Sequence, residues 1–373
     1  MNTNKKSNLF TASLLKEIDE FAKNNGFVDS KEYLLSIHSA YKKTKDSLKP
    51  YKRNVKAKHE VIFKSKLGSI LNDDSLNWLH NPKNKNKVDL VMTSPPFGLN
   101  SKKSYGNELA EDYCEWFRPF AEGLSKVLKK DGSLVIDICG TWRKDAPVRS
   151  LYHFELLQML CKEYGFYLCQ EHYWWNPAKL PSPAAWVNKE RSRVKDSINC
   201  IWWLSKSPNP KASNKKVLGP YSTEMKKLIG KTDLPKVIRP SGHDISQKFS
   251  KDNGGSIPPN LLAIANTDSN SFYINYCKKN DLEIHPARFP AGIPDYFIRF
   301  LTEKNDLVID PFGGSSMTGY VAEKLNRKWV SIELDKEFAA TGIGRFKDPK
   351  PYKRLKSKYW IYSPCQGPEI NEN

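Results

Sequence analysis

The sequence has 373 residues, of which 39% are hydrophobic, and its 60 Lys and Arg residues against 41 Asp and Glu give a formal net charge of +19. This length predicts a catalytic core with one or two smaller attachments. The polar composition and the lack of an apolar run of about 18 residues exclude a membrane-spanning helix. The positive charge favours nucleic acid as a partner, although a lysine-rich solvated surface would give the same total.

The amino-terminus and the cysteines narrow the class of protein further. The segment MNTNKKSNLF is basic but lacks the apolar stretch and cleavage site of a secretory signal, so we expect a cytoplasmic protein. The seven cysteines are scattered, with no CxxC pair and no histidine at zinc-finger spacing. We therefore expect neither a disulfide framework nor a bound metal.

Residues 1–58 are predicted to form a helical attachment. Apolar residues recur at helical spacing between residues 11 and 45, interrupted by Asn25 and Gly26, which indicates two amphipathic helices. A lysine-rich stretch with Pro50 follows, as expected of an exposed connection or of an arm that faces phosphates.

Residues 59–204 alternate between strand and helix patterns. A short strand near residue 60, a turn at 72–74 and a short helix through Trp78 precede the apolar run VDLVMT, residues 88–93, which indicates a buried strand. Further elements are expected at the helix 112–129, the strand 133–140, the helix 151–164, and the strands 167–174 and 198–204. This succession is typical of a doubly wound, mostly parallel α/β sheet.

The remaining chain divides into three parts. Periodicity fades in residues 205–257, where Lys, Ser, Pro and Gly accumulate, so this insert is either a flexible linker or a nucleic-acid-reading module. Organised sequence resumes in residues 258–345, and residues 346–373 form a tail. The elements expected in the resumed part are the helix 294–303, the strand 306–310, the helix 318–325 and the strand 329–333.

A glycine-rich turn joins the last two predicted strands. The first strand ends at Asp310, passes through Gly313 and Gly314 into a helix, and is followed by a strand that ends at Glu333. Glycines let a backbone approach a ligand, a helix amino-terminus offers free N–H groups, and an acid about 20 residues further on can bind ribose hydroxyls. The segment fits a nucleotide-like ligand, although a tight structural turn would explain the glycines equally well.

A second motif, Thr93-Ser94-Pro95-Pro96-Phe97, follows the VDLVM strand directly. Two prolines fix the backbone and remove donors, which leaves carbonyl acceptors at the carboxyl end of a strand, where α/β sites form. An exocyclic amine needs such acceptors while its lone pair is directed at an electrophilic methyl group, and Phe97 can stack on an extruded base. The alternative is a rigid loop with a core phenylalanine.

Together the two motifs resemble those of the amino-methyltransferases that modify DNA. In that family Ser, Asn or Asp followed by Pro-Pro and an aromatic residue holds the target amine, and a DPF-GSG-type loop holds S-adenosylmethionine. Catalytic loop first, variable insert in the middle and cofactor loop last is the circularly permuted order called the beta class. The resemblance covers about residues 60–340. It implies a Rossmann-like methyltransferase fold in which 59–204 is the catalytic half, 205–257 the target-recognition insert and 258–345 the cofactor-binding half.

The resemblance also implies roles for individual residues. Ser94, Pro95, Pro96 and Phe97 would be catalytic, and WWNPAKLPSP, residues 174–183, would border the pocket for the target base. The segment DDSLNWL resembles the family's GDSL segment, and HPARFP resembles a segment that lines the cofactor pocket. The implied cofactor-binding residues are Asp74, Thr93, Phe289, Asp310, Pro311, Phe312, Gly313, Gly314, Ser315, Ser316 and Glu333.

Two positions depart from the family pattern. Where the family commonly has GSGTT, this chain has GSSMT, so Ser316 replaces a glycine. A positive φ at Ser316 would be penalised, and cofactor affinity is the property that this change would affect. Asp73 replaces the glycine of the GDSL-like segment.

The implied reaction is a direct displacement. The flipped base would stack on Phe97 and donate its amine to the Ser94 hydroxyl and the Pro95 carbonyl, while the nitrogen attacks the sulfonium methyl. Serine at position 94 is the form usually associated with cytosine-N4 modification, and adenine-N6 methylation would use the same parts. The Pro-Pro loop has no cysteine, which argues against cytosine-C5 chemistry. The chain could instead be an inactive DNA-binding module, or it could methylate RNA or protein.

Double-stranded DNA is the expected partner. The resemblance also implies a restriction endonuclease that acts on the same site, and the chain is expected to be a monomer or a homodimer. Paired tryptophans at 174–175 and 202–203 are more typical of a core than of base stacking. Candidate phosphate contacts, which a solvated face would explain equally well, are Lys189, Arg191, Arg193, Lys215, Lys216 and Arg239.

Overall fold

The computed structural model describes residues 12–36, 59–99, 108–143, 146–232, 237–238, 240, 244–245, 250–267 and 271–349. The chain divides into two compact units, Met1–Lys56 and Ala57–Asn373. In the first unit, α1 (Ala12–Asn24) is the first of the two expected helices. Residues 30–36 are helical, as expected for the start of the second helix, and the rest of that prediction lies outside the described residues.

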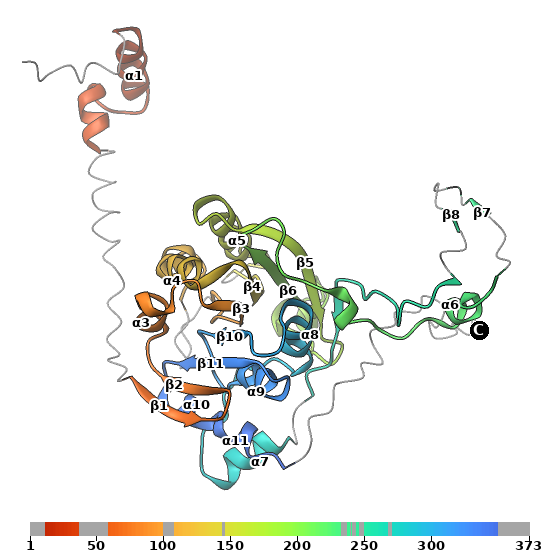
Figure 1. The fold of residues 1–373 in the computed structure, drawn as a ribbon. Helices are drawn as coiled ribbons and strands as arrows, with labels where there is room; N and C mark the ends of the chain where they lie inside the picture. Colours follow the sequence, from red (N-terminus) through yellow and green to blue (C-terminus); the bar gives the residue numbers. More distant parts are fainter. Residues whose placement is uncertain are drawn as a thin grey trace, which may run out of the picture. The chain divides into compact units, whose positions relative to one another are not determined.

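The second unit is built on a nine-stranded sheet with the order β1-β2-β11-β10-β3-β4-β6-β5-β9 (Figure 1). The strands from β2 to β4 in this order run parallel, whereas β1 and β6 are antiparallel to their neighbours. The mostly parallel α/β sheet expected from the sequence is thus confirmed. The strands are β1 (Glu60–Lys64), β2 (Gly68–Asn72), β3 (Val88–Thr93), β4 (Leu128–Ile138), β5 (Tyr167–Trp175), β6 (Ile198–Ser205), β9 (Leu261–Ala263), β10 (Leu307–Asp310) and β11 (Lys328–Glu333).

Helices connect the strands and cover both faces of the sheet (Figure 1). They are α3 (Ser75–Leu79), α4 (Tyr113–Val127), α5 (Tyr152–Glu163), α7 (Phe272–Lys279), α8 (Gly292–Leu301), α9 (Met317–Lys324), α10 (Lys336–Thr341) and α11 (Ile343–Phe346). Sequence periodicity predicted α4, α5, α8 and α9 closely but missed β9, α7, α10 and α11. No helix in the described ranges is long and apolar enough to cross a membrane.

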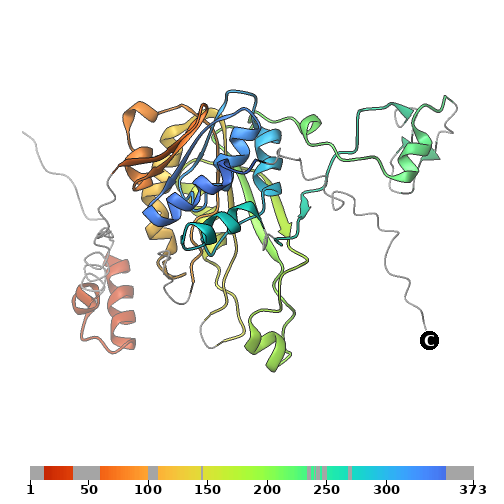
Figure 2. The same ribbon diagram turned by 90° about the horizontal axis from the view of Figure 1, so that it is seen from below.

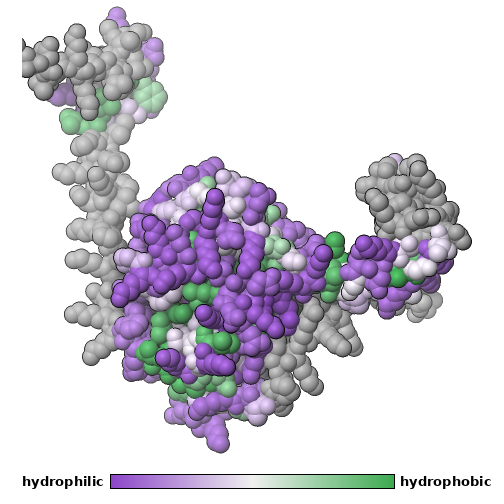
Figure 3. Space-filling model, in the orientation of Figure 1, coloured by the Kyte–Doolittle hydropathy of each residue, from purple (hydrophilic) through white to green (hydrophobic). Residues whose placement is uncertain are grey.

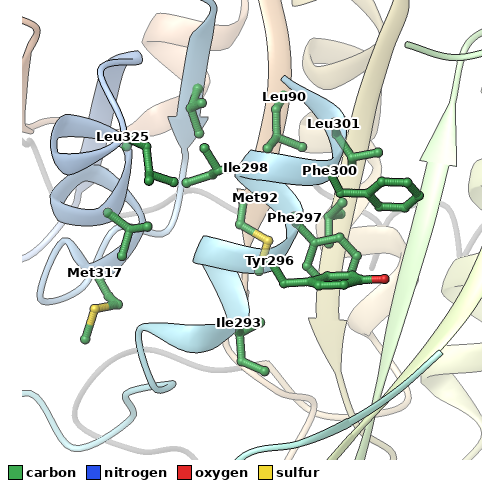
Figure 4. Packing of buried hydrophobic residues seen from close by; sticks show 14 of the residues in the cluster. Leu90, Met92, Ile293, Tyr296, Phe297, Ile298, Phe300, Leu301, Met317 and Leu325 are labelled. Atoms are coloured by element: carbon green, nitrogen blue, oxygen red, sulfur yellow. The ribbon is translucent and has the colours of Figure 1, made fainter. Parts of the chain in front are cut away.

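Strand β3 lies at the centre of the core. All of its residues are buried. Leu90 and Met92 pack with residues of α8 and α9 on one face (Figure 4), whereas Val91 packs with residues of α4 and α5 on the other. A parallel strand covered on both faces must be apolar nearly throughout, which is why VDLVMT was recognisable as a buried strand.

Strand direction determines at which edge of the sheet each loop emerges. Strands β10, β3, β4 and β5 end at one edge, here called the carboxyl edge, whereas β6 ends at the opposite, amino edge. The loop of residues 176–197, here called the hairpin loop, joins β5 to β6 and therefore lies at the carboxyl edge. It includes the short helix η2 (Ala185–Lys189) and extends away from the sheet (Figure 2).

The insert of residues 205–257 begins at the amino edge. The Lys211 N–H donates to the Asp131 carbonyl (3.1 Å) and the Ser213 N–H donates to the Phe300 carbonyl (2.9 Å), so its first residues are fixed there. Its regular elements are short: η3 (Asn214–Lys216), α6 (Thr223–Leu228), β7 (Val237–Ile238) and β8 (Asp244–Ile245). The surface seen in Figure 3 is mainly hydrophilic, as the lysine-rich composition predicts.

Candidate active site

The two sequence motifs meet between strands β10 and β3. These strands are neighbours, but β3 continues through α4 to β4 on one side and β10 continues through α9 to β11 on the other. Such a topological switch point opens a crevice at the carboxyl edge, where α/β proteins bind ligands. The Thr93 hydroxyl donates to Asp310 Oδ1 (2.6 Å), which ties the Pro-Pro loop directly to the glycine-rich loop.

Asp310 holds the glycine-rich loop in shape. Besides Thr93, its buried carboxylate accepts hydrogen bonds from the Thr318 hydroxyl (2.8 Å) and the Phe312 N–H (3.1 Å). Burial raises the pKa of Asp310 to about 6 against the opposing effect of these donors. Because its donors come from the protein itself, Asp310 acts on a cofactor through the loop that it supports.

Glu333 is the acid better placed for a ligand. Its Oε2 accepts from the Gly314 N–H (2.7 Å) and its Oε1 from the Asp335 N–H (3.0 Å). Burial raises the pKa of Glu333 to about 7. The side chain is nevertheless only partly buried, and each carboxylate oxygen retains acceptor capacity for a hydroxyl donor. This is the chemistry that a ribose diol requires.

The glycine-rich loop depends on tight backbone geometry. A Cβ at Gly313 would lie 2.2 Å from Ser331 Oγ, and Gly314 has a φ of +48°. Ser316, which replaces a family glycine, has φ 57° and ψ 40°, so the positive φ anticipated from the sequence is confirmed. Its buried hydroxyl has no hydrogen-bond partner within the described part of the chain. The loop thus carries backbone strain at Ser316.

Arg345 supports the same loop from behind and was not predicted. Its Nε donates to the Ser315 carbonyl (2.7 Å) and its Nη2 donates to Ser315 Oγ (2.7 Å). The guanidinium lies over the Tyr273 ring, 4.2 Å from the centroid. No sequence signal pointed to Arg345, because it belongs to α11, which the periodicity did not reveal.

The other expected cofactor residues surround these loops. Asp74 caps α3, with its Oδ1 accepting the Leu76 N–H (3.0 Å). Phe312 packs against the ring of Phe120, with centroids 4.9 Å apart. Pro311 is buried and Phe289 is partly buried against the cluster formed by α8 and α9. Phe312 and Pro311 are therefore fixed mainly by packing.

Asp137 stands beside the Pro-Pro loop and was missed by the sequence reasoning. It lies near the end of β4, next to β3, and is 2% exposed. Burial raises the pKa of Asp137 to about 6, opposed by hydrogen bonds from the side chains of Asn199 and Ser94. The Asn199 amide donates to Asp137 Oδ1 at 3.1 Å. A buried acid in the otherwise apolar strand SLVIDI was the signal that could have identified it.

The rest of the Pro-Pro loop is only partly open. Pro95 is buried, whereas Ser94, Pro96 and Phe97 are partly buried. Phe97 packs against the cluster formed with α4 and α5. Its ring thus has a structural role and retains some exposed surface at the carboxyl edge.

The predicted phosphate contacts fall at opposite edges of the sheet. Lys189, Arg191 and Arg193 are exposed on the hairpin loop at the carboxyl edge. Lys215 is exposed on η3, and neighbouring Lys216 donates to the Thr302 carbonyl (3.0 Å) and pairs with Glu303, before the start of β10. Lys216 therefore anchors the insert at the amino edge, away from the Pro-Pro loop. Arg239 lies outside the described residues.

Three of the four paired tryptophans belong to the core, as their spacing on strands suggested. Trp174, Trp202 and Trp203 are 7%, 1% and 7% exposed. The Trp174 indole donates to the Ile264 carbonyl (2.8 Å) and the Trp203 indole to Ser133 Oγ (2.9 Å). Within the described residues, no group of three or more His, Cys, Asp or Glu side chains is arranged to hold a metal ion.

Comparison with known proteins agrees with this geometry. Residues 88–343 match the family model described as DNA methylase. The chain is 52% identical over 284 residues to the Type II methyltransferase M.PvuII of Proteus hauseri, covering 75% of this chain and 84% of that one. It is 27% identical over 281 residues to the Type II methyltransferase M.BglII of Bacillus subtilis, covering 74% and 68%.

A solved structure gives the same picture. The structure titled PvuII DNA methyltransferase (cytosine-N4-specific) superimposes with a TM-score of 0.64 and 41% sequence identity, over 82% of this chain and 95% of that one. The family match extends over both motifs, the insert and the sheet that joins them. The chain therefore belongs to the DNA methylase family that these comparisons define.

Proposed function

We propose that this protein transfers a methyl group from S-adenosylmethionine to the N4 amine of cytosine in double-stranded DNA. The observation that carries the proposal is the Ser94 hydroxyl, hydrogen-bonded to the buried Asp137 carboxylate at the topological switch point. The relative at 52% identity is a Type II methyltransferase, and the superimposed structure is titled cytosine-N4-specific. Both names support cytosine over adenine as the target.

The residues of the glycine-rich loop fit the cofactor. Glu333 offers carboxylate oxygens to the ribose hydroxyls, and the small residues Gly313 and Gly314 let the backbone come close. Asp74 and Phe289 would complete the adenosine site, while Asp310, Ser315 and Ser316 keep the loop in place. When bound, the cofactor supplies an electrophilic methyl group on a sulfonium.

Ser94 and Asp137 handle the amine and its proton. The amine N–H donates to Ser94 Oγ and to the Pro95 carbonyl, which directs the nitrogen lone pair toward the methyl group. As the N–C bond forms, the amine proton moves to Ser94 Oγ and the Ser94 proton moves to Asp137. Asn199 keeps the Asp137 carboxylate oriented through its amide. Phe97 offers its exposed ring surface to the base.

DNA is the partner that matches both the site and the charge. A cytosine amine becomes accessible at the carboxyl edge only if the base leaves the helix, and Lys189, Arg191 and Arg193 would contact the phosphates there. By analogy with the Type II relatives, the protein would work in the cytoplasm beside a restriction endonuclease of the same specificity. Either a monomer or a homodimer is compatible with this role.

The test is to identify the product. Purified protein is incubated with DNA and methyl-labelled S-adenosylmethionine, and the digested nucleosides are resolved by mass spectrometry. Label in N4-methylcytosine is the expected result. Label in N6-methyladenine would overturn the base assignment, and DNA binding without any label would favour an inactive DNA-binding module.

A further inference from the structure

The hairpin loop, residues 176–197, lies next to the proposed target pocket. Strand β5 ends at the same edge as β3 and β4, so the loop begins at the level of Ser94 and Asp137. The positive charge of Lys179 is one of the effects that oppose the burial-driven rise in the pKa of Asp137, which places this lysine near the buried acid. The first arm of the loop therefore borders the pocket.

Contacts with the neighbouring loop hold the hairpin loop in position. The Asp196 carboxylate accepts a hydrogen bond from the Trp142 indole (2.7 Å) and pairs with Arg149, both from the segment that follows β4. Lys195 Nζ donates to the carbonyls of Lys179 (3.1 Å) and Pro177 (3.5 Å), which joins the two arms. The loop is thus fixed on the protein before any DNA arrives.

This loop exposes an aliphatic side chain to solvent. Leu180 is 79% exposed and lies between Lys179 and Pro181. A single exposed leucine is ordinary on a protein surface. Leu180, however, is held beside a pocket meant for an extruded base, on a loop whose exposed Lys189, Arg191 and Arg193 suit phosphates.

Removing a base from a duplex leaves a gap in the stack. Unstacking and unpairing cost a few kcal/mol, and enzymes that deform DNA often insert an apolar side chain between base steps. We propose that Leu180 enters the duplex as the target base leaves and fills the space that the base vacates. This inference rests on the proposed function, because it requires a base to be flipped into the site.

The hairpin loop also supplies an internal control. Val194 is 87% exposed, an aliphatic residue of the same loop, but it lies on the second arm between Arg193 and Lys195. Neither Leu180 nor Val194 is buried, so truncation of either to alanine should leave folding intact. The conservative variant Leu180→Met retains a side chain that can still fill the gap.

The experiment compares two duplexes that contain the site methylated by the wild-type protein. In one the target base is normally paired, and in the other it lies opposite an abasic position and is already unpaired. Leu180→Ala should lower kcat/KM about 10-fold or more on the paired duplex and only about 2-fold on the unpaired one, since the unpaired base needs less help to leave the stack. Leu180→Met should recover most of the loss, and Val194→Ala should leave the ratio between the duplexes unchanged.

An equal loss on both duplexes, no loss on either, or the same ratio change in Val194→Ala would overturn the assignment to Leu180. Failure of the wild-type protein to methylate either duplex would instead overturn the proposed function, and the inference with it. The two failures are therefore distinguishable in one set of assays.

Discussion

Two buried aspartates flank strand β3 and differ in what their hydrogen bonds reach. Asp310 in β10 and Asp137 in β4 are each 2% exposed, and burial raises the pKa of each to about 6. The hydroxyl donors to Asp310, Thr93 and Thr318, are themselves buried at 0% and 1% exposure, whereas Ser94, which donates to Asp137, is partly exposed. A raised pKa alone therefore does not identify a catalytic acid.

The comparison assigns different tasks to the two sides of the site. On the cofactor side, donors that belong to the protein saturate Asp310, so its carboxylate stabilises a loop. On the target side, the Ser94 hydroxyl stands between the Asp137 carboxylate and the space where an amine would lie. The same burial thus serves loop structure on one side and proton transfer on the other.

The largest effect is expected for Asp137→Asn. The substitution keeps the volume of the side chain but removes the carboxylate that takes the proton from Ser94, so kcat should fall by about 10²- to 10⁴-fold. The dissociation constant of S-adenosylmethionine, measured by calorimetry, should stay close to that of the wild type. A variant that keeps kcat within about 3-fold of the wild type would contradict the role given to Asp137.

Glu333→Gln should act on the cofactor side alone. Hydrogen bonds to a charged group contribute about 1.5 to 3 kcal/mol, so cofactor affinity should weaken by about 10- to 100-fold. At saturating cofactor, kcat should change little, because Glu333 does not contact the amine. Loss of kcat without loss of affinity would reverse the division between the two sides.

The basic residues at the two edges of the sheet offer a smaller, graded test. Replacement of Lys189, Arg191 and Arg193 by alanine should weaken DNA binding and reduce the slope of log K against log salt by about 0.9 for each phosphate that these side chains neutralise. Lys215→Ala, at the amino edge, should leave that slope unchanged. Fluorescence anisotropy across a salt series measures both, and a larger change for Lys215→Ala would place the DNA at the other edge.

The smallest effect concerns the strained loop. Ser316→Gly should stabilise the protein by about 1 kcal/mol, because glycine tolerates the left-handed backbone and the unpaired hydroxyl is removed. Its neighbour is the matched control: Ser315→Gly should destabilise, because it removes the hydroxyl that accepts a hydrogen bond from Arg345 Nη2. Thermal denaturation with and without S-adenosylmethionine compares the two, and a lower Tm for Ser316→Gly would show that its hydroxyl is needed.

Much of the fold was predictable because local patterns determine it. The apolar run of β3, the helical periodicity of α4 and α8, and the turn after Asp310 all have signals within a few residues. The short elements β9, α7, α10 and α11 escaped, since elements of this length show too few periods to recognise. The positive φ of Ser316 was anticipated because only one residue type was out of place.

The site was predictable where a motif is contiguous and not where the sheet assembles it. Ser94 and Glu333 stand in recognisable segments, but Asp137 and Asn199 come from separate strands that only the order β3-β4-β6 brings together. Likewise, charge alone grouped Lys189 with Lys216, whereas strand direction separates them. Long-range topology is the information that local sequence lacks.

The pH dependence of the methyl-transfer step tests the central claim most directly. Because the raised pKa of Asp137 is about 6, its ionised form increases with pH through that value. The single-turnover rate at saturating cofactor and DNA should therefore rise about tenfold per pH unit below about 6 and level off above it. Asp137→Asn should give a low rate without this inflection. An unchanged inflection in Asp137→Asn, or a flat wild-type profile, would contradict the assignment of Asp137 as the proton acceptor.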